Sequence, residues 1–311
     1  MNKSAIIKII IASVVVLILT AVLIVSLVGE RSNLLKNIFH GISNSDSYKS
    51  GNINVSTESI TGLDVNWISG SVKITTHNGS EISVSETSSD ILDDEDKLCY
   101  LVENGVLYIK YWKPRGVFSF GRMFSPTKYL TVSIPESKAD LLDTLKVDAV
   151  SADTNIDKIS IDDMDLKSVS GNIYITPVGS ANSIKANTVS GEININAIVD
   201  SADFKSVSGD IVFNNIVKKI ACKSVSGDID IKSENCPDEI YAKSVSGEIT
   251  FTIPENKGFT AKYSKVSGNF NCSFATVNSK EKAVYGDGSA SFEFSTVSGD
   301  ISIKNIKIKY Y

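Results

Sequence analysis

A six-residue motif with glycine at its fourth position recurs seven times in the second half of this chain. The copies are SVSGNI at 168–173, TVSGEI at 188–193, SVSGDI at 206–211, SVSGDI at 224–229, SVSGEI at 244–249, KVSGNF at 265–270 and TVSGDI at 296–301. Successive glycines lie 20, 18, 18, 20, 21 and 31 residues apart. Recurrence at a nearly constant spacing indicates stacked structural units of one kind.

Apolar residues keep a fixed position relative to each glycine. The residues two before, two after and four after it are apolar in every copy, beginning with Val169 and Ile173. This alternation predicts a strand with one face turned inward. Earlier in each unit the apolar residues fall five and seven before the glycine, as Phe204 and Ala202 do. We therefore expect two short strands per unit, joined at a corner around the Lys-Ser pair, such as 205–206.

The same template fits two degenerate copies, one at 145–156 with alanine in place of the glycine and one at 63–74. Stacked in parallel register, the units place equivalent residues about 4.8 Å apart. The pattern favours an all-β fold, a β-solenoid of 18–21-residue repeats, with right-handed coils preferred. The alternative is an antiparallel sandwich, because regularly spaced strands also suggest one. A sandwich gives no reason for the same letters to recur at the same phase.

The first residues have the character of a membrane anchor. Residues 9–28 are 20 uncharged and mostly apolar residues, enough at about 1.5 Å per residue to cross a bilayer core of about 30 Å. Lys3 and Lys8 precede this predicted transmembrane helix, so residues 1–8 are expected in the cytoplasm and the rest outside, as a single-pass cell membrane protein. A cleaved secretory signal is the alternative, although its apolar region normally spans about 7–15 residues.

The rest of the chain divides by composition. Residues 29–50, rich in Ser, Asn and Gly, are an expected juxtamembrane stalk, either a plain linker or a short helix at the lipid surface. Residues 51–311 are the expected extracytoplasmic β-repeat domain. Within it, residues 75–144 depart from the repeat and are expected to be an insertion or a cap over open strand edges. The elements expected there are strands at 81–86 and 129–134, and a hairpin at 99–111 turning at Asn104-Gly105.

One loop inside this segment is unusual in composition. Residues 112–128, WKPRGVFSFGRMFSPTK, hold Lys113, Arg115, Arg122 and Lys128, no acidic residue and several aromatic ones. On an acidic domain such a loop is suited to lipid headgroups or to an anionic partner. The binding candidates are Trp112, Lys113, Arg115, Phe118, Phe120, Arg122 and Phe124. The alternative is that the aromatic side chains pack over the end of the solenoid with the basic residues in water around them.

Charge and cysteine content argue against several classes of protein. The net charge is −5; residues 1–30 contain two lysines and one glutamate, a net of +1, so the remainder carries −6. Nucleic acid is not an expected partner, because nucleic-acid-binding faces are strongly basic. The four cysteines follow no zinc spacing. Cys222 and Cys272 fall at inward positions and are interpreted as small core residues, with a Cys222–Cys236 disulfide as an alternative outside the cytoplasm.

The sequence shows no recognisable catalytic constellation. His40 and His77 are its two histidines and both precede the seven glycine motifs, so a Ser-His-Asp or Cys-His arrangement is not expected among them. Each glycine motif lies between two strands and not before a helix, which argues against a phosphate-binding or dinucleotide-binding loop. No catalytic residue, metal ligand or cofactor is therefore assigned.

The residue after each glycine would form a polar ladder on successive coils. Its members are Asn172, Glu192, Asp210, Asp228, Glu248, Asn269 and Asp300. A basic ladder is expected beside it, formed by Lys167, Lys205, Lys223 and Lys243. A row of divalent cations is one hypothesis, since hard cations take oxygen ligands. The simpler interpretation is turn chemistry, in which carboxylates cap backbone amides and ladders of opposite charge pair.

Several segments together resemble a known family. The repeated SVSGDI and SVSGEI, TVSIPES at 131–137, TFTIPEN at 250–256 and YGDGSASFEFSTVSGDI at 285–301 resemble the bacterial DUF4097 family over about residues 50–311. The resemblance implies a membrane-anchored, extracytoplasmic β-repeat protein of adhesin type, frequently encoded beside envelope-stress regulators. It supplies no catalytic residues to carry over.

Two functions of different class follow. The first is a non-enzymatic, adhesin-like envelope protein whose lateral faces or basic aromatic loop bind a cell-wall polymer or a neighbouring envelope membrane protein. The second is a polysaccharide-acting β-helix enzyme that uses carboxylates such as Asp210, Asp228 and Glu248. Catalysis needs a local cleft with matched acids and bases, whereas these acids are evenly repeated and the loops are short. Binding is therefore the favoured hypothesis.

Overall fold

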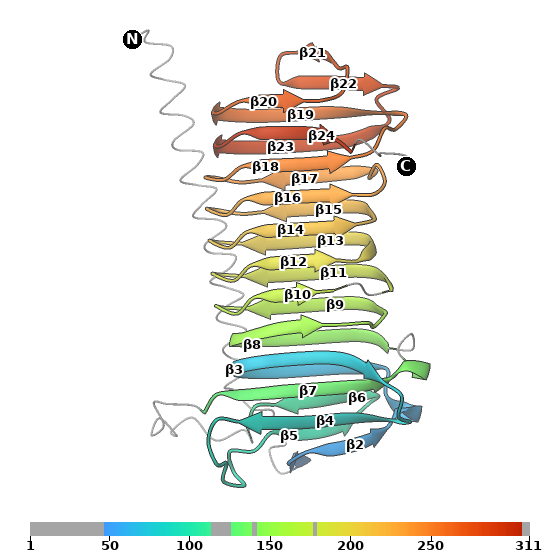
Figure 1. The fold of residues 1–311 in the computed structure, drawn as a ribbon, viewed down its shortest axis with the longest axis vertical. Helices are drawn as coiled ribbons and strands as arrows, with labels where there is room; N and C mark the ends of the chain where they lie inside the picture. Colours follow the sequence, from blue (N-terminus) through green and yellow to red (C-terminus); the bar gives the residue numbers. More distant parts are fainter. Residues whose placement is uncertain (1–46, 113–125, 139–141, 177–178, 307–311) are drawn as a thin grey trace. The chain divides into compact units, whose positions relative to one another are not determined.

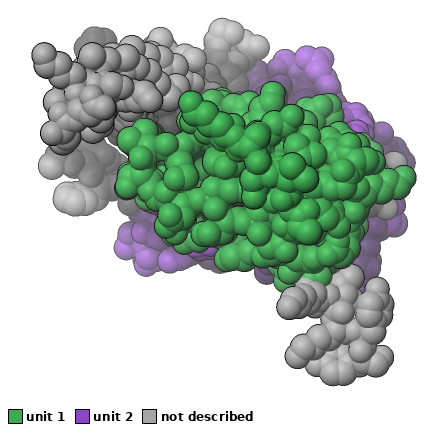
Figure 2. Space-filling view, turned by 90° about the horizontal axis from the view of Figure 1, so that it is seen from above, with its two compact units in different colours: residues 1–30, 200–311 green, residues 31–199 purple. Residues whose placement is uncertain are grey.

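The computed structural model describes residues 47–112, 126–138, 142–176 and 179–306 (Figure 1). These residues form an all-β fold with the short 3-10 helices η2 (Thr57–Ser59) and η3 (Glu136–Lys138). Two compact units are present, coloured separately in Figure 2. The described part of unit 2 ends at Val199, and that of unit 1 covers residues 200–306.

The predicted anchor, residues 9–28, and most of the predicted stalk lie outside the described residues. Where the structure describes the chain, it contains no helix of the length and apolar character needed to cross a membrane.

The strands of unit 2 are β1 (Lys49–Ser50), β2 (Ile53–Ser56), β3 (Gly62–His77), β4 (Glu81–Ser88), β5 (Cys99–Glu103), β6 (Val106–Lys110), β7 (Lys128–Pro135), β8 (Leu142–Ile156), β9 (Ile161–Ser168), β10 (Ile173–Ile175), β11 (Ser180–Thr188) and β12 (Ile193–Asn196). Unit 1 contains most of β13 (Ile198–Ser206), then β14 (Ile211–Asn215), β15 (Val217–Lys223), β16 (Ile229–Ser233), β17 (Glu239–Lys243), β18 (Ile249–Ile253), β19 (Gly258–Ser267), β20 (Phe270–Cys272), β21 (Val277–Ser279), β22 (Lys282–Gly286), β23 (Ala290–Ser298) and β24 (Ile301–Asn305).

In unit 1 each repeat forms one coil of two strands. The second strands, β14, β16 and β18, pair in parallel and place Ile211, Ile229 and Ile249 side by side. The first strands do the same, with Ile220 of β15 beside Ile240 of β17. Their apolar side chains are buried between the two strand layers. The predicted stacking of equivalent residues in parallel register is confirmed, because no sandwich of antiparallel hairpins has this pairing.

Unit 2 is built on the same principle. Ile173 of β10 lies beside Ile193 of β12, and β9 pairs in parallel with β11. The long strands β3 and β8 run through the corner and pair along their length, with Leu63 opposite Leu145 and Gly70 opposite Ala152. Both degenerate copies of the template are therefore in the register that the sequence predicts.

Coils do not follow the order of the sequence everywhere. In unit 1, β23 lies between β17 and β19, and β24 lies between β18 and β20 (Figure 1). The coil 290–305 is thus inserted between the coils 239–253 and 258–272. The long interval between Gly268 and Gly299 holds the hairpin β21–β22, which returns the chain to the inserted position. The spacing marks this copy as irregular but does not reveal its place.

The segment 75–144 contains another coil of unit 2. β6 and β7 pair in parallel with β3, on the side opposite β8. Antiparallel strands continue outward from this coil, β5 from β6 and β4 from β7. Its hairpin turns at Asn104 and Gly105, with φ of 51° and 79°, as their sequence predicts. The segment carries no glycine motif, so its coil was not recognisable in the sequence.

The corner of each coil lies later than the sequence analysis placed it. Ser168, Gly171 and Ile173 are buried, whereas Val169 is half-buried and Ser170 is exposed. The change of phase therefore falls on the Val-Ser pair that follows the Lys-Ser pair, and the expected inward ladder of valines is wrong. The inward position belongs to the first serine of the motif, because its hydroxyl has a backbone partner inside the corner.

Candidate functional site

Each corner is held by the first residue of its motif and by the glycine. In four coils the amide of the glycine donates to the Ser or Thr hydroxyl three residues earlier. These pairs are Gly171 and Ser168 at 2.8 Å, Gly191 and Thr188 at 2.9 Å, Gly209 and Ser206 at 2.8 Å, and Gly227 and Ser224 at 2.8 Å. Ser or Thr holds this position in six of the seven copies, and this recurrence is the sequence signal for the corner.

The glycine is required by close contact between neighbouring coils. A Cβ added to Gly227 would lie 2.1 Å from the carbonyl oxygen of Gly209, and one added to Gly247 would lie 2.3 Å from that of Gly227. Backbone atoms cannot yield to such a contact, so only glycine fits. The most repeated residues of the chain thus build the coil and are not free for a ligand.

The polar ladder after the glycines is also engaged between coils. Asp210 accepts the amide of Asp228 at 2.9 Å, and Asp228 accepts the amide of Glu248 at 2.7 Å. Asn172 does the same for Glu192, at 2.9 Å, in unit 2. The turn-chemistry interpretation is supported, because each short side chain caps the backbone of the next coil.

The glutamates of the ladder bond differently. Glu248 accepts the Thr250 hydroxyl of its own coil at 3.2 Å, and Glu192 accepts the Asn194 amide at 3.0 Å. The extra methylene explains this, since it carries the carboxylate past the neighbouring amide. The lysines of the expected basic ladder do not pair with the acids of the polar ladder where the structure shows their ion pairs. Lys167 pairs with Asp165 and Lys205 with Asp203, in each case the residue two positions earlier.

The basic aromatic loop leaves the outer coil of unit 2 between β6 and β7. Lys113, Arg115, Phe118, Phe120, Arg122 and Phe124 lie outside the described residues. Trp112, the first candidate, is half-buried and packs edge-to-face on Tyr111 with ring centroids 5.1 Å apart. The loop therefore starts from an aromatic anchor on the coil.

Lys128, at the other end of this loop, is not the solvated residue that the sequence suggested. Its side chain is fully buried and pairs with Glu86 of β4 at 2.8 Å. The ammonium also donates to the carbonyl oxygens of Asp96 and Tyr111 and lies over the Trp67 ring, 5.1 Å from its centroid. Burial lowers the pKa of Lys128, and Glu86 acts in the opposite direction. Lys128 therefore fastens the loop to the outer coil.

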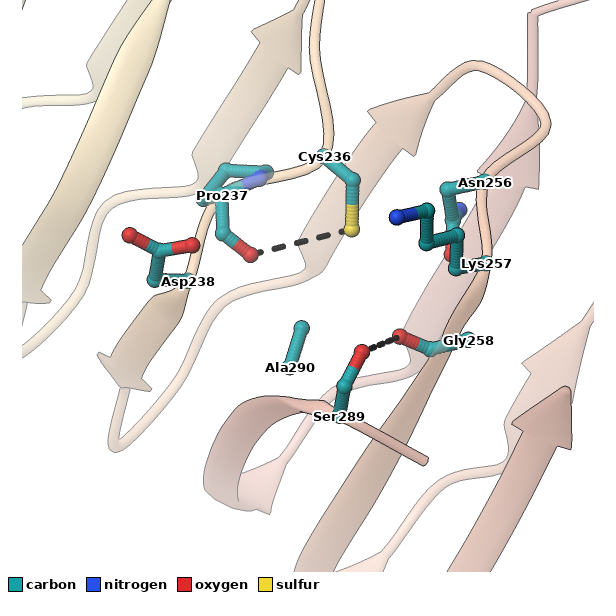
Figure 3. A pocket seen from close by; sticks show the side chains of 8 residues that line it. All are labelled: Cys236, Pro237, Asp238, Asn256, Lys257, Gly258, Ser289 and Ala290. Carbon is teal, nitrogen blue, oxygen red and sulfur yellow. Dashed lines mark hydrogen bonds between the residues drawn. The ribbon is translucent and has the colours of Figure 1, made fainter. Parts of the chain in front are cut away.

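A shallow pocket of about 360 Å³ lies in unit 1, where three connections between strands meet (Figure 3). Its lining residues are Cys236, Pro237, Asp238, Asn256, Lys257, Gly258, Ser289 and Ala290. Ser289 donates to the Gly258 carbonyl at 3.3 Å, and the Cys236 thiol points to the Pro237 carbonyl at 3.7 Å. The polar groups at the rim thus bond mainly to the adjacent backbone.

The chemistry of this pocket does not suit a nucleophile. Burial, followed by the carboxylates of Asp238 and Asp287, raises the pKa of Cys236 to about 11. The thiol stays protonated at neutral pH, and the lining holds no histidine to activate it. All four cysteines are free thiols, so the alternative of a Cys222–Cys236 disulfide is wrong. Cys222 is buried as predicted, whereas Cys272, in the outermost coil of unit 1, is half-buried.

Other groups with catalytic potential are structural where they are described. His77 is the last residue of β3, and its ring bonds to the turn before β4: one ring nitrogen accepts the Gly79 amide and the other bonds the Glu81 carbonyl. Within the described ranges, no three His, Cys, Asp or Glu side chains group closely enough to hold a metal ion.

Three solved bacterial proteins are similar to this chain. A candidate adhesin from Bacteroides fragilis matches with 16% identity and a TM-score of 0.50, over 86% of this chain and 100% of its own. A protein from Parabacteroides distasonis described as a candidate lipid binding protein has 18% identity, a TM-score of 0.48, and coverage of 83% and 97%. A candidate adhesin from Parabacteroides merdae has 12% identity, a TM-score of 0.44, and coverage of 83% and 96%. No protein with curated annotation matches the chain.

The model of one protein family, described as Toastrack DUF4097, matches residues 60–304. This range includes the glycine motifs, both degenerate copies and the outer coil of unit 2. Since the match covers well over half of the chain, the protein belongs to the Toastrack DUF4097 family.

Proposed function

We propose that this protein is a non-enzymatic, adhesin-like binding protein of the cell envelope. Residues 9–28 anchor it in the membrane, and the β-repeat domain lies outside, where the basic aromatic loop holds an anionic cell-wall polymer. The positive-inside pattern of Lys3 and Lys8 supports this orientation. The Bacteroides fragilis protein of the same fold is described as a candidate adhesin, which agrees with a binding role.

The observation that carries the proposal is the use of the repeated polar residues between coils. Asp210 and Asp228, the acids that a polysaccharide-acting enzyme would employ, accept backbone amides of the next coil. Each uses its Oδ1 for this bond, and neither lines the pocket of unit 1, whereas a general acid or base works in a cleft that holds the substrate. Ligand binding is therefore assigned to a segment outside the repeats.

The loop is the segment with the charge for this role. Residues 112–124 hold Lys113, Arg115 and Arg122 without an acidic residue, on a chain with a net charge of −5. Its aromatic side chains can lie along sugar rings while the basic groups pair with phosphate or carboxylate. Trp112 and Lys128 fix its two ends on the outer coil.

The experiment compares two triple variants of the full chain in detergent micelles. The loop variant is Lys113→Gln, Arg115→Gln and Arg122→Gln; the control is Lys218→Gln, Lys219→Gln and Lys232→Gln, which loses the same charge from exposed lysines of unit 1. We expect the loop variant to bind an anionic wall glycopolymer at least tenfold more weakly, because each contact contributes about 1 kcal/mol. The control stays within twofold of wild type.

Equal losses in the two variants would show that net charge alone decides binding. Reducing ends released from the glycan are measured in the same samples. Turnover that disappears in Asp228→Asn, with folding unchanged, would contradict the non-enzymatic proposal and favour the polysaccharide-acting alternative.

A further inference from the structure

The outermost coil of unit 1 is half uncovered. β19 and β20 pair on one side with β23 and β24. On the other side, β22 pairs with the first half of β19, from Gly258 to Lys262. Beyond the Tyr263 amide, which donates to the Glu281 carbonyl at 3.0 Å, residues 263–272 have no partner strand on that outer side within the described part of unit 1. Figure 2 looks onto the end of unit 1 at which these strands lie.

An uncovered parallel coil is a template for a further strand, because its outer backbone groups are unpaired. In the inner coils of unit 1, the carbonyl oxygen of each motif glycine is covered by the motif glycine of the next coil. A Cβ added to Gly299 would lie 2.2 Å from the carbonyl oxygen of Gly247, and one added to Gly268 would lie 2.1 Å from that of Gly299. Gly268 is the last member of this row, so its own carbonyl faces outward.

The outermost copy has a lysine at the motif position that is Ser or Thr in the other six copies. Lys265 is paired in register with Thr296, which holds the Ser or Thr position of the adjacent coil and is buried. The Lys265 ammonium is exposed and donates to the Gly268 carbonyl at 2.7 Å. In two inner coils this carbonyl accepts a hydroxyl of the neighbouring coil, Gly227 that of Ser244 at 3.4 Å and Gly247 that of Thr296 at 3.5 Å. Lys265 occupies the corresponding acceptor of the outermost coil.

Behind Lys265, the interior of the half coil is covered by two aromatic rings that are themselves half-buried. Tyr263 and Phe270 stack with centroids 3.8 Å apart and an interplanar angle of 5°. What stays outside is the strand edge and Val266, whose exposed fraction is 54%. Tyr263, Phe270 and Cys272 are half-buried, whereas their register partners in the adjacent coil, Phe294, Ile301 and Ile303, are buried. A second chain would therefore cover this apolar surface together with the strand edge.

The outer coil of unit 2 supplies a comparison. There β4 and β5 pair with β7 and β6, and the buried Lys128 donates to two backbone carbonyls. Among the described coils, the half coil 263–272 is the one whose outer edge lacks such a strand. A second copy would therefore meet it through the same half coil, in a closed twofold dimer and not in a fibre.

We propose that Lys265 is an end-stop that keeps a second copy of the chain from stacking on the half coil 263–272. The Lys265 ammonium donates a hydrogen bond to the Gly268 carbonyl. In a dimer it would be buried beside the Lys265 ammonium of the second copy. Burying two like charges at a strand edge opposes association, and lysine is a common means of protecting such edges.

The test is the size of the full chain in density-matched detergent micelles, measured by sedimentation over a range of protein concentrations. Lys265→Ser restores the residue of the inner copies, and we expect it to lower the dimer dissociation constant at least tenfold. Lys265→Arg keeps the charge and the donor and stays like wild type. Lys262→Ser is the matched control, because it removes one exposed charge from the covered half of the same strand and leaves the edge blocked.

A further variant locates the contact. Val266→Cys added to Lys265→Ser gives an intermolecular disulfide under mild oxidation, and Val266→Cys added to Lys262→Ser does not. If Lys265→Ser has a lower unfolding temperature than wild type, Lys265→Thr replaces it, because threonine is the residue found at 188 and 296. Three results would overturn the proposal. The first is a folded Lys265→Ser or Lys265→Thr chain that stays as monomeric as wild type. The others are equal association of Lys262→Ser and a wild type that already dimerises through Val266.

Discussion

Single residues at the corner decide whether a coil closes. The hydroxyl of Ser224 accepts the Gly227 amide at 2.8 Å in a place where water does not reach. A buried amide without an acceptor costs about 1–3 kcal/mol. The first serine of the motif therefore contributes to stability, although it is small and polar.

Ser224→Ala is expected to lower the free energy of unfolding by about 1–3 kcal/mol, because the Gly227 amide loses its acceptor. Ser224→Thr should stay near wild type, since threonine holds this position at 188 and 296. The measurement is thermal unfolding of both variants beside Ser226→Ala, which changes an exposed residue of the same corner. Equal stability of Ser224→Ala and Ser226→Ala would show that the hydroxyl has no structural role.

Cys236 is expected to react slowly with alkylating reagents in the folded chain. Its pKa is raised from 9.0 to about 11, so at pH 8 its thiolate fraction is about 100-fold smaller than that of an ordinary thiol. The rate should rise about tenfold per pH unit and level off near pH 11, as followed by mass spectrometry of the Cys236 peptide. The same peptide in the urea-unfolded chain is the control. A folded-state rate that levels off near pH 9 would contradict the environment described for this thiol.

At the scale of the element, the turn after each strand carries its own connection to the next coil. Asp228, between β15 and β16, accepts the amide of Glu248 in the following turn at 2.7 Å. Such bonds lie at the exposed rim and link one coil to its neighbour, so they stabilise the register in which the coils stack.

Asp228→Ala is expected to destabilise the chain by about 0.5–1.5 kcal/mol, because the Glu248 amide loses its protein acceptor. Asp228→Asn keeps an oxygen in the same place, as Asn172 does in unit 2, and should cost little. Thermal unfolding with and without calcium measures both effects. Calcium-dependent stabilisation that Asp228→Asn removes would favour a row of cations over turn chemistry.

The sequence predicts the strands of the coils because the same residues recur at the same positions in every copy of the motif. The strands, the parallel register and both degenerate copies follow from the glycine position and the apolar phase. The corner was misplaced by one pair because Val169 is apolar, yet it lies half-exposed outside the turn. The burial of Lys128 was missed because its partners, Glu86 and Trp67, come from strands distant in the sequence. Neither contact leaves a local pattern.

The molecule as a whole combines a regular scaffold with segments to which action on other molecules is assigned. Repeated residues are engaged between coils, and the binding role is assigned to the loop that leaves the outer coil of unit 2. The order of coils was not predictable, because a period states which residues are equivalent and not which coils are neighbours. Only the 31-residue interval before Gly299 hinted at an exception.

Engineered disulfides test the stack of coils, and the inserted last copy, most directly. Ser246 and Ser298 are bridge partners, and Ser267 lies opposite Ser298 on its other side. Neighbouring coils are about 4.8 Å apart, within reach of a disulfide, whereas coils separated by one more are about twice as far. Cysteine pairs at 246 and 298, and at 267 and 298, should therefore form intramolecular disulfides, and a pair at 246 and 267 should not. Efficient linkage of 246 to 267, with none to 298, would contradict the inserted position of the last copy, and linkage of none of the three pairs would contradict the stack of coils.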